Sequence, residues 1–186
     1  LSVKIDPYTY RVLKKDCLDL PEKTYTVRSV GMTMEQIRMY KDLQKEAMTL
    51  LESGDLVSAP QVITQMLRIQ QVLSGHIKTD EGDLIEVPTQ RLSAMMDCVE
   101  EVSGKIIIWS RFRYDIVHIQ AELAKVYGEQ SVVSYYGDTS DQDRQLAIDR
   151  FQNGTARFFV ANPATAGYGL TLTEASTVIY YANDFN

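Results

Sequence analysis

The chain has 186 residues, of which 45% are hydrophobic, and a formal net charge of −6 at pH 7. This length fits one domain, or a core with a helical appendage, and the apolar content supports a sizeable core. The acidic balance argues against a protein that coats nucleic acid through bulk positive charge, although it leaves room for a local basic groove.

The cysteines and the hydropathy pattern indicate the compartment in which the protein is expected. Cys17 and Cys98 stand far apart and form no CxxC pair, so a metal site has little support and both are expected to be free thiols in a reducing compartment. No apolar run is long enough for a signal peptide or a membrane span, which predicts a cytoplasmic protein with no membrane partner. The chain begins with Leu1, as expected for a processed or cut piece whose neighbours matter.

The first helix is expected after a short strand. Alternating side chains over residues 24–30 predict the strand. Thr33 and Gln36 form a capping box, which predicts a helix that starts there and ends at Gly54. The side chains expected on its buried face are Ile37, Tyr40, Leu43, Ala47 and Leu51.

A second helix is predicted from Pro60 to Gly75, and residues 76–88 are expected to form an exposed linker or hairpin. The side chains expected on the buried face of this helix are Val62, Met66, Ile69 and Leu73. Residues 1–88 therefore read as an N-terminal extended and helical region, distinct from residues 89–186.

The sequence pattern of residues 89–186 is typical of an α/β domain. After a helix over 92–102, short apolar runs predict buried strands at 105–110, 132–135, 158–161 and 178–181. One helix is predicted at 114–127. A second is predicted to end at Asn153 and to begin at Ser140, which caps it, with Asp143 three residues further on. The side chains expected on the buried faces of these helices are Ile116, Ile119, Leu123, Val126, Leu146, Ala147 and Phe151. Alternating strands and helices predict a parallel sheet with right-handed crossovers.

The polar loops of this domain follow the carboxyl ends of the predicted strands, where ligands of parallel sheets gather. Arg111 and Arg113 follow the first strand, and their residue types suit either phosphate contacts or a solvated loop. Residues 137–140 lead into a helix N-terminus, which suits an anion or, as the commoner alternative, a plain N-cap.

The glycines near the end of the chain, Gly167 and Gly169, permit positive φ or a close backbone approach. They do not complete a G-x-G-x-x-G fingerprint, because Leu172 stands at the third glycine position. Gly104 and Lys105 do not form a Walker A loop, because Ile106 replaces the Ser or Thr that would hold magnesium. His76 and His118 stand singly, which favours ordinary surface or packed histidines.

Several ordered stretches together resemble the C-terminal RecA-like lobe of Swi/Snf-type superfamily-two helicase-like ATPases, in their compact phage or bacterial branch. The resemblance covers nearly the whole chain. The stretches that carry it are Arg11-Val-Leu-Lys-Lys-Asp-Cys-Leu-Asp-Leu-Pro-Glu-Lys-Thr24, Thr33-Met-Glu-Gln-Ile-Arg-Met-Tyr40, Leu67-Arg-Ile-Gln-Gln-Val-Leu73, Ile106-Ile-Ile-Trp-Ser-Arg-Phe112, Tyr136-Gly-Asp-Thr-Ser140, Gly167-Tyr-Gly-Leu-Thr-Leu-Thr-Glu-Ala175 and Asn183-Asp-Phe-Asn186.

The resemblance implies half of a DNA-translocating motor, in which ATP and Mg²⁺ sit in a cleft between two lobes and are bound mainly by a first lobe missing here. The implied partners are that first lobe and duplex DNA, contacted along its backbone. The implied DNA-phosphate residues are Ser110, Arg111, Thr139, Asn162 and Thr165. Those implied to couple the nucleotide cleft to the DNA groove are Gly167, Gly169, Leu170, Thr171 and Glu174.

Two departures from the family pattern limit what the fragment can do. The family's eukaryotic pattern has an arginine where Ala164 stands and a glycine where Ala166 stands, so this loop is less basic and phosphate contact there must rest on the backbone and Thr165. The first lobe and the arginines of motif VI are absent, which predicts a fragment that does not hydrolyse ATP. The alternatives are a non-catalytic RecA-like module that binds DNA or protein, and a different nucleotide-dependent α/β enzyme such as a methyltransferase.

Overall fold

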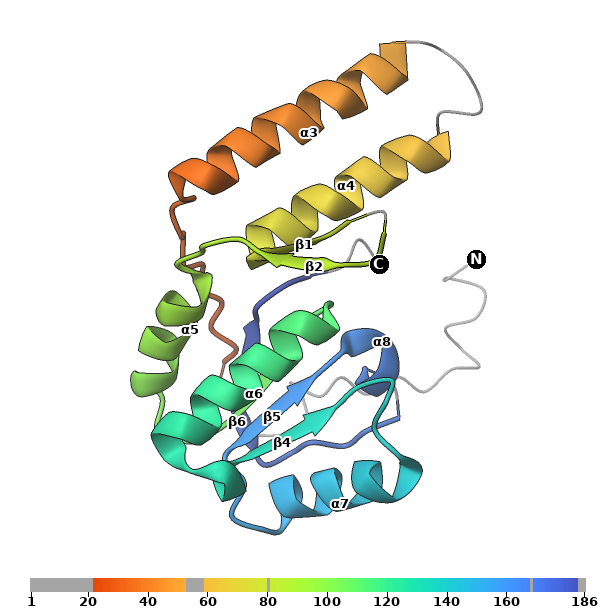
Figure 1. Cartoon of the computed structure of the whole chain (residues 1–186). Coiled ribbons are helices and arrows are strands. Elements are labelled where there is room, and N and C mark those ends of the chain that lie inside the picture. Colours follow the sequence, from red (N-terminus) through yellow and green to blue (C-terminus); the bar gives the residue numbers. More distant parts are fainter. Residues whose placement is uncertain (1–21, 53–58, 80, 168, 184–186) are drawn as a thin grey trace, which may run out of the picture.

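The computed structural model describes residues 22–52, 59–79, 81–167 and 169–183. These residues form two parts, which Figure 1 shows one above the other: a pair of helices with a small hairpin, and a sheet covered by helices. The helical pair is the arm, residues 34–52 and 59–74, and the sheet part begins at α5 (Arg91–Glu100).

The sheet is parallel throughout, as predicted. Its strands are β3 (Lys105–Trp109), β4 (Val132–Tyr135), β5 (Phe158–Ala161) and β6 (Ala175–Tyr180), in the spatial order β4-β5-β3-β6. β5 lies between β4 and β3 and pairs with both, so that Phe158 faces Val132 on one side and Ile106 on the other. The last strand starts three residues earlier than the apolar pattern predicts, because Ala175 pairs with Lys105.

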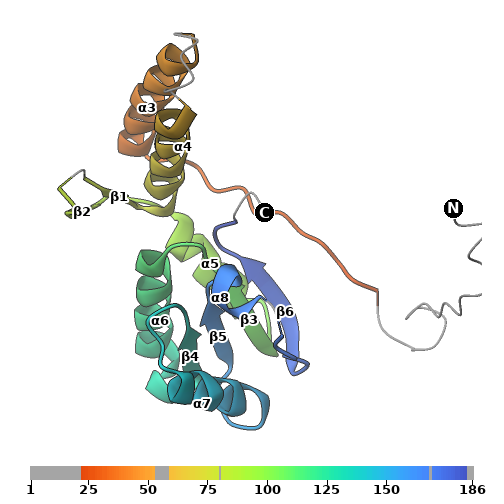
Figure 2. The same cartoon turned by 90° about the vertical axis from the view of Figure 1, so that its right-hand side faces the viewer.

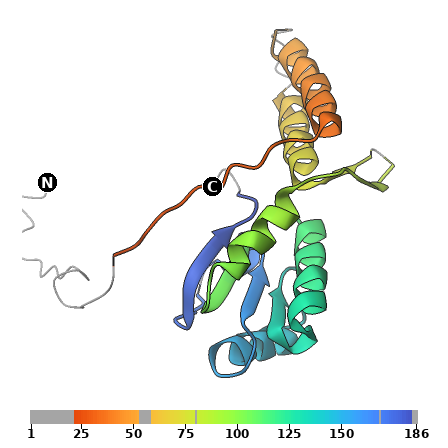
Figure 3. The ribbon, with the colours of Figure 1, turned by 90° about the vertical axis from the view of Figure 1, so that its left-hand side faces the viewer.

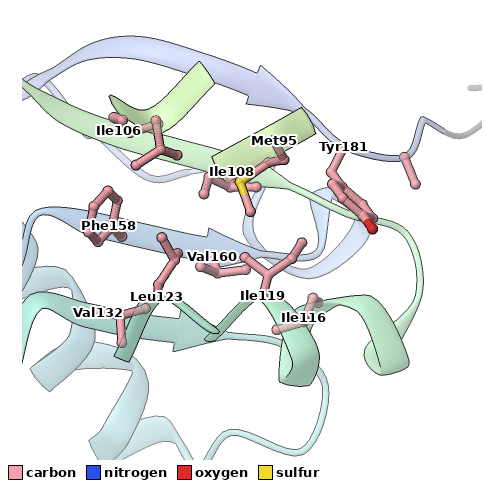
Figure 4. Packing of buried hydrophobic residues seen from close by; sticks show 12 residues of the cluster. Met95, Ile106, Ile108, Ile116, Ile119, Leu123, Val132, Phe158, Val160 and Tyr181 are labelled. Carbon is pink, nitrogen blue, oxygen red and sulfur yellow. The ribbon is translucent and has the colours of Figure 1, made fainter. Parts of the chain in front are cut away.

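Helices cover both faces of the sheet and define two apolar clusters. α5 and α6 (Arg113–Tyr127) pack on one face, where Met95, Ile119 and Phe158 belong to the cluster of Figure 4. α7 (Asp141–Gln152) packs on the other face, where Phe151 lies against Phe159 with ring centroids 5.3 Å apart. Helices are expected on both faces of a parallel sheet, because the strands of such a sheet carry apolar side chains on both faces, which must be covered.

The arm consists of α3 (Met34–Glu52) and α4 (Ala59–Ser74), which lie side by side in Figures 1 and 2. The predicted capping box opens α3: the Thr33 N–H donates to Gln36 Oε1 (3.0 Å) and the Gln36 N–H donates to Thr33 Oγ1 (3.2 Å). The buried Gln36 amide also donates to the Val72 carbonyl (2.8 Å), which joins the two helices. The predicted stop at Gly54 lies outside the described residues.

The predicted hairpin joins the arm to the sheet part. β1 (His76–Lys78) and β2 (Leu84–Glu86) pair antiparallel directly after α4. Gly75 takes a φ of 98° between α4 and β1, and a Cβ there would come within 2.6 Å of the Thr89 methyl. The glycine therefore sets the turn by which the chain leaves the arm.

Several predictions about this fold are wrong. Residues 24–30 form no strand: they run as an extended trace (Figure 3) that pairs with no strand of the described part of the chain, and the Val27 side chain is 91% exposed. Alternation predicts a strand only where another strand supplies hydrogen bonds. The predicted inward residues Leu51, Met66, Val126 and Leu146 are exposed.

Candidate functional site

The loops after β3, β4 and β5 meet at the carboxyl edge of the sheet. The Ser110 N–H donates to the carbonyl of Ala161 (3.0 Å), and the Asn162 N–H donates to the carbonyl of Tyr135 (3.1 Å). The chain after β6 joins the same edge, since the Tyr181 N–H donates to the Trp109 carbonyl (2.8 Å). Backbone hydrogen bonds therefore hold these strand ends together, as expected for a parallel sheet.

Asn162, a predicted phosphate contact, fastens these loops to one another. Its Nδ2 donates to the carbonyl of Arg111 (2.6 Å), and its Oδ1 accepts from the N–H of Ala164 (2.8 Å) at the start of α8 (Pro163–Ala166). The side chain thus joins the loop after β3 to the loop after β5. Asn162 lies at the predicted edge, but both ends of its amide are already used within the protein.

Ser110 is not placed as a phosphate contact requires. Its side chain is fully buried, and its hydroxyl donates to Asp115 Oδ2 (2.6 Å) in the first turn of α6. Its backbone N–H is bonded to Ala161. A buried acid that follows in the sequence thus takes up the Ser110 hydroxyl, and the predicted phosphate contact, which would require this hydroxyl to leave Asp115, stays a prediction.

A buried pair of titratable groups lies beside Ser110. His76 Nδ1 stands 3.7 Å from Asp115 Oδ1, and neither atom has a hydrogen-bond partner among the described residues. Burial lowers the pKa of His76 to about 4. Burial also raises the pKa of Asp115 to about 6, against the opposing effects of the Ser110 hydroxyl and Arg91. The pair is therefore uncharged between about pH 4 and pH 6, and a pocket of about 210 Å³ opens next to Asp115 and Tyr181.

Two arginines flank Phe112, and their environments differ. Arg111 is half-buried, donates from Nη1 to Gln70 Oε1 (2.6 Å) and lies 5.7 Å from the centroid of the Phe112 ring. Arg113 forms an ion pair with Asp138 and lies 5.8 Å from the Tyr136 ring. The charge of Arg113 is thus neutralised locally, whereas the partner of Arg111 through Nη1 is a neutral amide.

The loop after β4 is a turn that leads into α7. The Thr139 N–H donates to the Tyr136 carbonyl (3.0 Å), and the Tyr136 N–H donates to Thr139 Oγ1 (3.1 Å). Ser140 caps α7 as predicted, since its Oγ accepts from the Asp143 N–H (3.2 Å). The Arg144 guanidinium donates to the Gly137 carbonyl (3.2 Å), which links α7 to the turn. Thr139 is half-buried at the same edge as Arg111 and Asn162.

The two glycines of the loop after β5 are required for different structural reasons. Gly167 is in the right-handed helical region, but a Cβ on it would lie 2.3 Å from the Pro163 carbonyl oxygen. Gly169 has a φ of 77° and open space around it. Close approach and positive φ, the two properties that the sequence predicts for this pair, are both present. Thr165 lies half-buried between Asn162 and Gly167.

The other predicted coupling residues, Leu170, Thr171 and Glu174, differ in their surroundings, and Glu174 lies away from the carboxyl edge. Leu170 is half-buried against the cluster under α7, whereas Thr171 and Glu174 are exposed. The Glu174 N–H donates to Gln152 Oε1 (3.3 Å) at the end of α7, and the next residue pairs with Lys105 at the start of β3. Glu174 therefore lies at the amino edge of the sheet, away from Gly167 and Gly169.

Sequence reasoning did not select Gln70, His76 or Asp115 for this site. Gln70 and Arg111 are 41 residues apart and meet only because α4 ends against the sheet part. Asp115 stands five residues after Ser110, and that short separation is the only signal that could have suggested their hydrogen bond. The lone His76, expected to be an ordinary surface or packed residue, is packed: its ring stacks on Tyr114 with centroids 4.4 Å apart.

The described residues contain neither a cluster of metal ligands nor a helix that could cross a membrane. Within those ranges, no three or more His, Cys, Asp or Glu side chains gather in a way that could hold a metal ion. Among the helices so described, none has the length and apolar content needed to cross a membrane. Cys98 is a free, half-buried thiol, and Cys17 lies outside the described ranges.

Comparisons with known proteins point to one family. Residues 90–186 match the family described as helicase conserved C-terminal domain. The chain is 25% identical over its whole length to YwqA of Bacillus subtilis, which carries the name of an ATP-dependent helicase/translocase, and it spans 21% of that protein. It therefore represents about a fifth of this relative.

Two solved structures from Sulfolobus solfataricus share the fold. The C-terminal domain of its SWI2/SNF2 ATPase matches with a TM-score of 0.68 at 24% identity, covering 82% of this chain and 68% of that domain. The SWI2/SNF2 ATPase core in complex with double-stranded DNA matches with a TM-score of 0.71 at 26% identity, covering 97% of this chain and 40% of that core.

Replacing Asp115 by Asn tests the buried pair. His76, with its lowered pKa, contributes stability that is present above pH 6.5 and lost as the pH falls toward 4. Asp115, with its raised pKa, contributes stability that is present below pH 3.8 and lost as the pH rises through 6, so it offsets His76 on acidification. We expect the unfolding free energy of Asp115→Asn to fall about 1–3 kcal/mol further than that of the native chain between pH 6.5 and 4.

Urea denaturation at a series of pH values measures this difference. Asp42→Asn, at an exposed position of α3, is the matched control and should follow the native profile. Parallel profiles for Asp115→Asn and the native chain would show that burial does not raise the pKa of Asp115.

Proposed function

The chain belongs to the helicase conserved C-terminal domain family, as the RecA-like C-terminal lobe of a Swi/Snf-type helicase-like ATPase, and from this membership we propose that it is the second motor lobe of an ATP-dependent DNA translocase. It spans only part of its relatives, so this function is that of an assembly to which the lobe contributes. Its contribution is a surface for the DNA backbone and one wall of the nucleotide cleft.

The observation that carries the DNA part of this proposal is the gathering of phosphate-binding groups at one edge. Arg111, Thr139 and Thr165 lie on loops that backbone bonds and the Asn162 amide hold together. Guanidinium, hydroxyl and backbone N–H groups are the usual donors to DNA phosphates, and they fix a protein on duplex DNA without reading its sequence. The similarity to a core solved with double-stranded DNA supports duplex DNA as the ligand.

The nucleotide part of the proposal assigns ATP and Mg²⁺ mainly to another lobe. The chain has no Walker A loop, and its described residues do not form a metal-binding cluster. These residues therefore do not fit the role of holding the metal–nucleotide complex themselves. In this proposal Gly167, Gly169 and the exposed Thr171 present backbone and a small side chain to the facing lobe.

Arg111→Ala tests the DNA surface. Binding of the 186-residue chain to a short duplex should be weak and salt-sensitive, because the net charge is −6. Losing one phosphate contact should weaken binding several-fold and reduce the slope of log K against log salt by about 1. Fluorescence anisotropy over a salt series measures both quantities.

The control for this variant removes the same charge elsewhere. Lys125 is exposed in the last turn of α6, near the amino edge of the sheet, so Lys125→Ala should leave the slope unchanged. Equal slopes for Arg111→Ala and the native chain would remove Arg111 from the DNA surface. Tight, salt-resistant binding by the native chain would instead favour a non-catalytic binding module.

ATP hydrolysis by the 186-residue chain tests the nucleotide assignment. We expect no turnover above background, with or without DNA, because loss of an arginine finger alone can cost about 10³-fold or more in turnover and the chain also lacks a phosphate loop. A steady-state phosphate-release assay measures this. DNA-stimulated turnover by the chain alone would contradict the assignment of ATP to a second lobe.

A further inference from the structure

The imidazole of His76, at the start of β1, packs into the segment that joins β3 to α6. Its ring meets Phe112 edge to face with centroids 5.0 Å apart and stacks on Tyr114 at 4.4 Å. His76 is only 3% exposed. The hairpin that continues the arm therefore contacts the start of α6, directly after the loop that carries Ser110 and Arg111.

The carboxyl group of Asp115 lies between this imidazole and the loop. Its Oδ2 accepts from the Ser110 hydroxyl (2.6 Å), whereas its Oδ1 stands 3.7 Å from His76 Nδ1. The second distance is too long for a hydrogen bond, and both atoms are buried without a partner among the described residues. Folded proteins leave few buried polar atoms in this condition, because each of them has lost its bonds to water. A small approach of the two side chains satisfies both atoms at once.

The chemistry of the pair favours such a contact above about pH 6. A neutral imidazole that carries its proton on Nδ1 donates to a carboxyl oxygen, and the hydrogen bond is stronger when the acceptor is ionised. Burial lowers the pKa of His76 to about 4 and raises that of Asp115 to about 6. A neutral imidazole therefore faces a carboxylate above about pH 6 and a neutral carboxyl group just below it.

The other titratable and charged groups around Asp115 leave this role to His76. Arg91 opposes the effect of burial on Asp115, and its Nη1 is bonded to Ser74 Oγ and to the Tyr181 carbonyl (both 3.3 Å). Burial raises the pKa of both nearby tyrosines, so they stay neutral near pH 7. These groups are Arg91 on α5, Tyr114 and His118 on α6, Glu86 on β2, and Tyr181 after β6.

The arm is attached to the sheet part close to this pair. Arg91 holds Ser74, the last residue of α4, and Gln70 accepts from Arg111 Nη1 (2.6 Å) one helical turn earlier. Both attachments lie at the end of α4 that is nearest the sheet part in Figure 1, so motion of the arm turns about this end.

The size of the motion follows from the gap. Closing the 3.7 Å distance to about 2.9 Å, with Ser74 as a pivot roughly 6–7 Å away along an extended chain, is a rotation of about 7°. The 16 residues of α4 span about 24 Å, so the same rotation moves the far end of the helix by about 3 Å.

We propose that His76 and Asp115 form a two-position joint between the arm and the sheet part, open in this structure and closed when His76 Nδ1–H donates to Asp115 Oδ1. Because the other carboxyl oxygen holds Ser110, closure also acts on the loop that carries Arg111. The joint thus links the position of the arm to the geometry of the carboxyl edge. Its consequence for DNA rests on the proposed function, whereas the joint itself does not.

Nuclear magnetic resonance of the 186-residue chain without DNA tests the joint. Backbone residual dipolar couplings report the orientation of the arm relative to the sheet part, and the chain has only two histidines whose imidazole signals need assignment. Between pH 5 and pH 7.5 we expect the arm to rotate by about 5–10°. The midpoint should lie at about pH 6, and the His76 Nδ1–H signal of the closed position should grow with the rotation.

Two variants remove the pH dependence by different routes. His76→Phe keeps a ring beside Phe112 and Tyr114 but has no nitrogen, and Asp115→Asn keeps the shape of the side chain but does not titrate. In each of them the arm should have one orientation at both pH values. The spread of amide signals shows whether a variant is folded, and Asp115→Asn decides the question where His76→Phe is not.

The matched control is His118→Gln. Histidine is the side chain that ordinarily titrates near neutral pH, and His118 is the other histidine of the chain. This variant should rotate between pH 5 and pH 7.5 as the native chain does.

The outcomes separate the joint from the proposed function. One arm orientation at both pH values in the native chain would overturn the joint and leave the proposed function intact. A rotation that persists in His76→Phe or Asp115→Asn, or that disappears in His118→Gln, would also overturn it, because the responsible group would then lie elsewhere. Native duplex affinity for Arg111→Ala, by contrast, would overturn the proposed function and leave the joint intact.

Discussion

The central position of β5 is the constraint on which the rest of this molecule depends. Because β5 pairs in parallel with both β3 and β4, the three strands end at the same edge, and the loops that follow must share it. Asn162, the first residue after β5, uses this placement to bind Arg111 and to start α8. A polar edge of fixed geometry therefore follows from strand order, and the apolar clusters on both faces hold that order.

The proposed binding of DNA depends on the charged side chains at the carboxyl edge of the sheet. The chain as a whole is acidic, and Arg113 is paired with a carboxylate, so bulk attraction to DNA is small. Arg111 donates from Nη1 to the Gln70 amide oxygen, and its backbone carbonyl accepts from Asn162. In the proposed function, this edge is the part of the lobe that faces the DNA backbone.

The sheet and its helices could be predicted from the sequence because buried parallel strands leave continuous apolar runs, such as residues 106–108. Topology then places Arg111, Thr139 and Asn162 at one edge without further information. The hydrogen bond of the Ser110 hydroxyl depends on the burial of Asp115, and the contact of Gln70 depends on where α4 ends; neither property has a local pattern. The strand expected at 24–30 failed for a related reason, since the described residues supply no neighbouring strand for it.

Amide hydrogen exchange of the 186-residue chain, with and without duplex DNA, is the most direct test of the carboxyl edge as the DNA-facing surface. The account predicts slower exchange in residues 110–112, 136–140 and 162–167 when DNA is added, and unchanged exchange at the opposite edge, in residues 128–131 and 152–157. Slower exchange confined to residues 128–131 and 152–157, or to the far end of the arm, would contradict it.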